Sequence, residues 1–168
     1  MASSNRTPAS NLALGGMLAA LAVVIMCLGT SLVVATYACP VLCMVLLRIV
    51  LNLCGRRMAW AWYGAVALLS ALLAPDKEAA AVFLFLGYYP IVKPWLDRRK
   101  LSWLWKGLLF NSVTGIMYWL LMNLLGMDYL AEEFFGMGLV MLAVLLVLGN
   151  VTFFLMDRML GMKLRKRK

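Results

Sequence analysis

The side chains best suited to recognising a small molecule are aromatic and amide groups near one set of predicted loops. They are Tyr37, Tyr118, Trp119, Asn123 and Tyr129. Aromatic walls with a few polar groups line most small-molecule pockets, and aromatic faces attract cations. The neighbouring loops carry five of the seven acidic residues and one lysine, which favours neutral or cationic solutes over anions. We therefore predict a pocket for a small, ring-containing solute; the alternative is an aromatic belt that faces lipid.

The residue types that most enzymes and metal sites need are scarce. The chain has no histidine, which is the commonest metal ligand and a frequent general base. Zinc-helix, Ser/Lys and phosphate-loop motifs are also missing from the sequence. The cysteines lie in or at the ends of apolar segments, where we interpret them as buried thiols: Cys27, Cys39, Cys43 and Cys54. We predict a protein that is not an enzyme and that holds no metal and no cofactor.

These side chains are carried by apolar segments long enough to span a bilayer. Of the 168 residues, 65% are hydrophobic, against roughly half in a soluble domain. At about 20 residues a span, this length predicts an all-α, polytopic membrane protein with a bundle of six transmembrane helices. We expect a disordered polar lead at 1–11, a transmembrane domain at 12–156 and a basic cytoplasmic tail at 157–168. The helices are predicted at about 12–28, 32–54, 58–74, 79–95, 106–126 and 134–156.

The positive charges orient these helices. The connector Gly87–Lys106 holds five basic residues and one acid, Asp97, and cationic loops of this length remain cytoplasmic during insertion. With both termini cytoplasmic, fourteen of the 16 Lys and Arg residues fall inside, Lys77 falls outside and Arg48 lies within a span. The pattern predicts a multi-pass protein of the cell membrane, with Trp60, Trp62 and Tyr63 as interfacial anchors at the start of the third span. We interpret the net charge of +9 as basic residues that contact anionic lipid headgroups, and we expect no nucleic-acid partner.

Two prolines, a glycine and an aspartate predict local features of the helices. Pro40 interrupts the backbone ladder, so either the second helix is kinked or Thr30–Cys39 is irregular and the regular helix begins at Pro40. Asp76 is expected to cap the fourth helix, and Gly87 and Pro90 are expected to bend its inner third. Polar residues within the spans are expected to hydrogen-bond between helices: Asn52, Asn111, Ser112, Thr114, Asn123, Asn150 and Thr152.

The first predicted helix carries small residues at helical spacing. Gly15 and Ala19 stand four residues apart, and so do Gly16 and Ala20. Small side chains at this spacing allow another helix to approach closely in a membrane. The sequence leaves two interpretations open: packing within this protein, or docking to a separate membrane subunit.

The whole chain resembles the substrate-binding S components of energy-coupling factor (ECF) vitamin transporters, which are six-helix bacterial proteins with cytoplasmic termini. The resemblance rests on size, topology, the small-residue first helix, the proline at the entry to the second helix and the turn Gly55–Arg57. The segments PDKEAA and GYYPIVKPWL are similar to those of a group of bacterial membrane proteins loosely associated with that superfamily. In the family, an Ala-x-x-x-Ala motif docks the transmembrane subunit. Here the matches begin with glycine, at Gly15 or Gly16, and the first outer loop is shorter.

The resemblance implies a role in uptake. Such a protein binds a micronutrient from outside and delivers it with a partner transmembrane (T) subunit and two ATPase subunits, without hydrolysing ATP itself. The alternatives are a non-transport membrane protein, such as an assembly factor, a structural subunit or an immunity protein, and a membrane enzyme.

Overall fold

The computed structural model describes residues 8–28, 35–123, 136 and 139–161. Within these ranges all the regular structure is helical, as the sequence predicts. The chain divides into two compact units, Met1–Trp95 and Leu96–Lys168. Each unit has its own set of packed helices.

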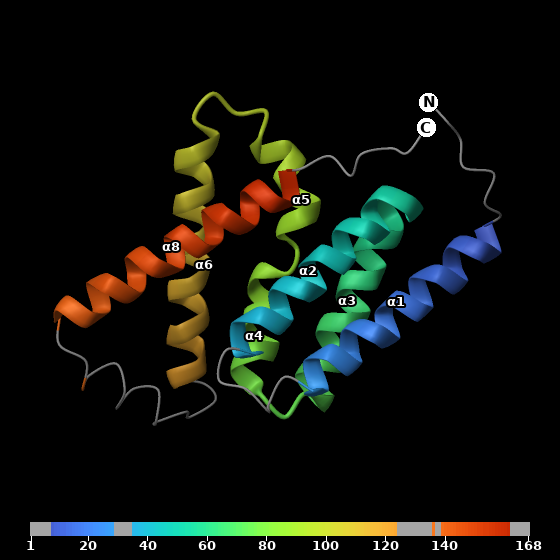
Figure 1. Cartoon of the computed structure of the whole chain (residues 1–168), viewed down its shortest axis with the longest axis horizontal. Coiled ribbons are helices and arrows are strands. Elements are labelled where there is room, and N and C mark those ends of the chain that lie inside the picture. The colour runs from blue at the N-terminus through green and yellow to red at the C-terminus, as the bar shows by residue number, and fades with distance from the viewer. Residues whose placement is uncertain (1–7, 29–34, 124–135, 137–138, 162–168) are drawn as a thin grey trace. The chain divides into compact units, whose positions relative to one another are not determined.

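The first unit is built around two central helices. Its elements are α1 (Pro8–Leu28), α2 (Ala35–Cys54), α3 (Arg56–Leu73), α4 (Lys77–Leu86) and α5 (Tyr89–Leu96), whose last residue opens the second unit. Both α2 and α3 pack against α1 and against α4 (Figure 1). Its fully buried apolar side chains therefore come from several helices, and among the largest are Met26, Met44, Leu47, Val66 and Phe83.

Two prolines and one glycine occupy distinct positions in and between the first three helices. Pro8 opens α1 four residues before the predicted start, because proline suits the first helical position, where its missing N–H is not needed. Pro40 lies inside α2, so the interpretation in which the regular helix begins at Pro40 is wrong; residues 30–34 lie outside the described ranges. The link from α2 to α3 is Gly55 alone, with φ 87° and ψ 174°, a conformation essentially restricted to glycine.

The start and the end of α4 follow the sequence signals. Asp76 caps the helix as predicted, because its Oδ1 accepts a hydrogen bond of 3.0 Å from the Ala79 N–H. The helix ends at Leu86, turns at Gly87 and Tyr88 and resumes as α5. A Cβ on Gly87 would lie 2.3 Å from the Phe83 carbonyl oxygen. This bend therefore needs glycine at its first residue.

Hydrogen bonds join the helix ends of the first unit in pairs. At one end, the Cys54 thiol lies 3.6 Å from the Asn11 carbonyl oxygen. At the other end, the Thr36 hydroxyl donates to Asp76 Oδ2 at 2.8 Å. The turn Gly55–Arg57 and the loop around Asp76 consequently lie at opposite ends of the helices.

The second unit contains α6 (Ser102–Asn123) and α8 (Leu139–Gly161), which cross in contact with each other (Figure 1). At the crossing, the Phe110 and Phe153 rings stack with centroids 4.5 Å apart. Beside them, Asn111 and Asn150 exchange two amide hydrogen bonds of 3.1 and 3.0 Å. For these two asparagines, the predicted hydrogen bonding between helices is confirmed.

Among the described residues, the helices from α1 to α8 correspond to the six predicted spans when α4 and α5 are taken as two parts of the fourth. At the far end of the chain, α8 continues to Gly161, so that Asp157 is helical rather than part of the predicted tail. Three stretches of the described chain are long and apolar enough to cross a membrane: Ala9–Leu28, Thr36–Cys54 and Lys77–Leu96. These stretches indicate a membrane protein.

Candidate functional site

A polar cluster forms where α2 and α4 begin. The Tyr37 hydroxyl donates to Glu78 Oε1 at 2.9 Å, beside the bond between Thr36 and Asp76. We call these four residues the acidic end of the first unit. Sequence reasoning included Tyr37 in the site but gave Asp76 only a capping role. The two pairs join residues 40 and 41 positions apart, so no local spacing could have indicated them.

The acidic end offers an aromatic ring beside negative charge. Tyr37 is exposed, and Asp76 and Glu78 are half-buried. The amino group of Lys77 donates to the Ala71 carbonyl oxygen at 3.1 Å, where a cation complements the C-terminal end of α3. Such a surface can attract a cationic or hydrogen-donating ring through charge and cation–π contacts.

Three other predicted binding residues lie in the last two turns of α6, in the second unit. Tyr118 is half-buried, whereas Trp119 and Asn123 are exposed on the same side of the helix. The Asn123 amide donates to the Trp119 carbonyl oxygen at 2.8 Å, within its own helix. Tyr129 lies outside the described residues.

One small-residue face of α1 packs inside the first unit. Gly15 is buried, and its carbonyl oxygen accepts a 3.1 Å hydrogen bond from the Trp62 indole N–H. A Cβ on Gly15 would lie 2.8 Å from Met58 Cε, the flexible end of a side chain on α3, so this position faces α3. Ala19 is half-buried. The prediction of Trp62 as an interfacial anchor is wrong, because its ring is buried between α1 and α3.

The other small-residue face of α1 points outward. Gly16 and Ala20 are exposed, and a Cβ added to Gly16 would meet nothing within 4 Å. Large exposed apolar side chains flank this pair at Met17 and Leu21. The structure therefore distinguishes the two pairs of small residues. Gly15 packs inside the unit, whereas Gly16 and Ala20 remain on its surface.

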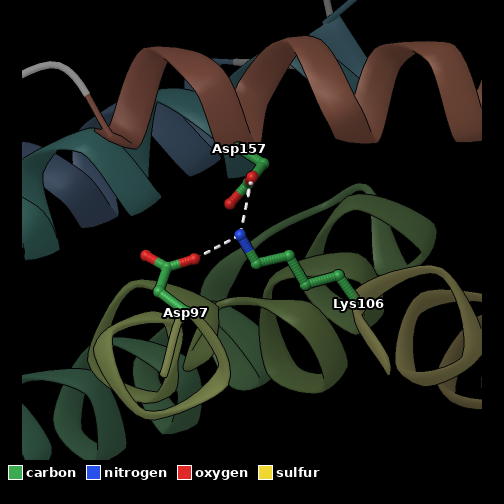
Figure 2. A network of polar contacts seen from close by, with 3 residues as sticks. All are labelled: Asp97, Lys106 and Asp157. Carbon is green, nitrogen blue, oxygen red and sulfur yellow. Dashed lines mark hydrogen bonds and ion pairs between the residues drawn. The ribbon is translucent and has the colours of Figure 1, made fainter. Parts of the chain in front are cut away.

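A buried lysine joins three parts of the second unit. Lys106 Nζ forms ion pairs with Asp97 and, at 2.9 Å, with Asp157 Oδ2 (Figure 2). The Lys106 side chain is 7% exposed, against 15% for Asp157 and 44% for Asp97. This triad links the connector before α6 to the last turns of α8. Sequence reasoning counted Lys106 only among the charges that orient the helices.

The described residues contain no group of three or more Cys, Asp or Glu side chains placed to hold a metal ion. Comparison of the chain with models of protein families, with curated proteins and with solved structures found no match. The described residues define the class of the protein: their regular structure is all helical, and three stretches among them are able to cross a membrane.

Proposed function

We propose that the protein crosses the membrane six times with both termini in the cytoplasm. The distribution of charge over the first unit supports this orientation. Arg56 and Arg57 are exposed at one end, whereas Asp76 and Glu78 lie at the other, where Thr36 contacts Asp76. Positively charged ends remain in the cytoplasm, so the acidic end faces outward.

On this basis we propose that the protein is the substrate-binding subunit of an ECF-type micronutrient importer. The observation that carries the proposal is the outward small-residue face at Gly16 and Ala20. A face of this kind lets a helix of another membrane protein approach closely, and its occupant here is the T subunit, which carries two ATPase subunits. The inward face at Gly15 is already used by Trp62, so it is not available for docking.

The proposed substrate is a small, neutral or cationic solute that contains a ring. Tyr37 with Glu78 at the acidic end supports this choice, since a ring beside a carboxylate favours such solutes. Tyr118, Trp119, Asn123 and Tyr129 remain proposed binding residues. Native mass spectrometry of the purified protein, followed by thermal-shift assays across a vitamin panel, tests the substrate class; no retained ligand and no shift would contradict it.

The docking proposal is tested by co-purification from native membranes. The double variant Gly16→Leu/Ala20→Leu should lose the T subunit and the ATPases while its thermal unfolding stays close to that of wild type. The matched control is Ala61→Leu/Gly64→Leu on the exposed side of α3, where a Cβ on Gly64 also meets nothing within 4 Å. The control should retain the partners. Equal loss in both variants, or unfolding of the first, would contradict docking through this face.

One observation favours the non-transport alternative. Trp119 is exposed and the Asn123 amide is bonded within its own helix, as expected of an aromatic belt against lipid. A structural or assembly subunit needs no outer pocket. Wild-type protein that purifies from native membranes without any ATPase pair would support that role instead.

A further inference from the structure

The five basic residues of the connector Gly87–Lys106 divide into two groups. Lys93 and Lys106 are buried, each 5% exposed. Arg98, Arg99 and Lys100 are all exposed in the turn that precedes α6. We call these three residues the basic turn. The connector's single acid, Asp97, forms an ion pair with Lys106.

Large apolar side chains follow the basic turn directly. Trp103 is 65% exposed and Trp105 is 51% exposed, and Leu101 and Leu104 are exposed as well. The Arg99 guanidinium lies 5.9 Å from the centre of the Trp105 ring, within the range of a cation–π contact. Positive charge and exposed aromatic surface thus adjoin each other in one short stretch of the second unit.

This combination fits the boundary of a bilayer better than it fits water. Tryptophan concentrates at the level of the lipid headgroups, and exposed lysine and arginine beside the membrane attract anionic lipids. A small soluble anion would complement the positive charge of the basic turn but would leave the tryptophans and leucines exposed. An anionic lipid satisfies both, because its phosphate meets the cations and its acyl chains meet the apolar side chains.

We propose that the basic turn, with Trp103 and Trp105, is a binding surface for an anionic phospholipid of the cytoplasmic leaflet. Arg99 contacts the lipid phosphate while it rests on the Trp105 ring, and Arg98 and Lys100 add charge on either side. The assignment to the cytoplasmic leaflet rests on the topology proposed above. The preference for an anionic headgroup rests on the charge and exposure of this stretch and does not depend on transport.

The test uses the full-length protein in a neutral detergent. Binding is measured by microscale thermophoresis with dioctanoyl phosphatidylglycerol, with dioctanoyl phosphatidylcholine and with inorganic phosphate. Wild type should bind phosphatidylglycerol more tightly than either of the others. Arg98→Gln/Arg99→Gln/Lys100→Gln should weaken this binding roughly a hundred-fold, at about five-fold for each charge removed.

Two further variants separate a defined surface from general attraction. Arg56→Gln/Arg57→Gln/Arg158→Gln removes the same charge from other exposed positions and should retain most of the affinity. Trp105→Leu keeps every charge but removes the ring beneath Arg99, and should weaken binding about two- to five-fold. Thermal unfolding of each variant checks that it is folded.

Three results would overturn the proposal: equal binding of the two lipids, equal loss in both triple variants, or inorganic phosphate that binds as tightly as phosphatidylglycerol. The last would show an anion site without lipid specificity. None of these measurements involves the T subunit or a transport substrate. Failure of the transport proposal therefore leaves them unchanged, and their failure leaves the transport proposal standing.

Discussion

Replacing Lys106 with methionine should destabilise the second unit more than any other change within its ion-pair triad. The substitution keeps most of the side-chain volume but removes the ion pair between Lys106 and Asp157, which is 15% exposed. Removing one partner of a fully buried ion pair costs about 3 to 5 kcal/mol. Because the two carboxylates retain some exposure, we expect Lys106→Met to lower the free energy of unfolding by about 2 to 4 kcal/mol.

The two aspartates should differ in the same assay. Asp157→Asn leaves Lys106 paired with Asp97 but weakens a charged hydrogen bond of 2.9 Å, at a cost of about 1 to 2 kcal/mol. Asp97 is 44% exposed, so Asp97→Asn should cost about 1 kcal/mol or less. In Lys106→Met/Asp157→Leu both partners of this ion pair are replaced by apolar side chains, and most of the lost stability should return.

Reversible unfolding by sodium dodecyl sulfate in mixed micelles, followed by far-UV circular dichroism, measures these free energies. Tryptophan fluorescence provides a second probe, and agreement between the two tests whether the transition is two-state. The reasoning is refuted if Lys106→Met unfolds like wild type, if Asp97→Asn costs as much as Asp157→Asn, or if the double variant is no more stable than Lys106→Met.

Five substitutions at four positions test three local features of the first unit by the same unfolding measurement. Gly55→Ala should cost about 1 to 3 kcal/mol because an alanine is strained at the positive φ of this residue. As a control, Gly64→Ala in the exposed middle of α3 should be neutral or stabilise by up to about 1 kcal/mol. Equal effects of the two substitutions would refute backbone strain at residue 55. Asp76→Ala should cost about 0.5 to 2 kcal/mol through the lost cap, and Asp76→Asn should recover much of it. A failure of asparagine to do so would assign the loss to the carboxylate's charge and its bond from Thr36 instead of the cap. Trp62→Phe should cost about 0.5 to 1.5 kcal/mol because the Gly15 carbonyl loses its indole donor, and an unchanged stability would show that this bond contributes nothing.

The features that could be predicted from the sequence depend on neighbouring residues. Asp76 before an apolar run predicts a cap, and Gly87 with Pro90 predicts a bend, because both effects act within one or two turns of the chain. The approximate position of each helical segment follows in the same way from the length of its apolar run. The exact ends were less predictable: α1 starts at Pro8 and α8 continues to Gly161.

The features that could not be predicted depend on which helices meet. The position of Trp62 at the start of a span predicts an interfacial anchor. In the structure α1 covers its ring, and the Gly15 carbonyl oxygen accepts a hydrogen bond from its indole N–H. In the sequence, nothing distinguishes Lys106 from its exposed neighbours Arg98 and Lys100. The fold brings Lys106 beside Asp157, which lies 51 residues later in the chain. The pairs Gly15/Ala19 and Gly16/Ala20 of α1 are equivalent in sequence. Only the position of α3, which faces Gly15 and not Gly16, makes them different.

Both the proposed transport role and the assignment of the lipid surface to the cytoplasmic leaflet rest on the orientation of the chain in the membrane. Labelling of single cysteines in intact cells with an impermeant maleimide measures it most directly, in a background whose four native cysteines are replaced with alanine. Our account predicts that Lys77→Cys is labelled from outside and that Arg99→Cys is labelled only after the cells are opened. Labelling of Arg99→Cys in intact cells would contradict it.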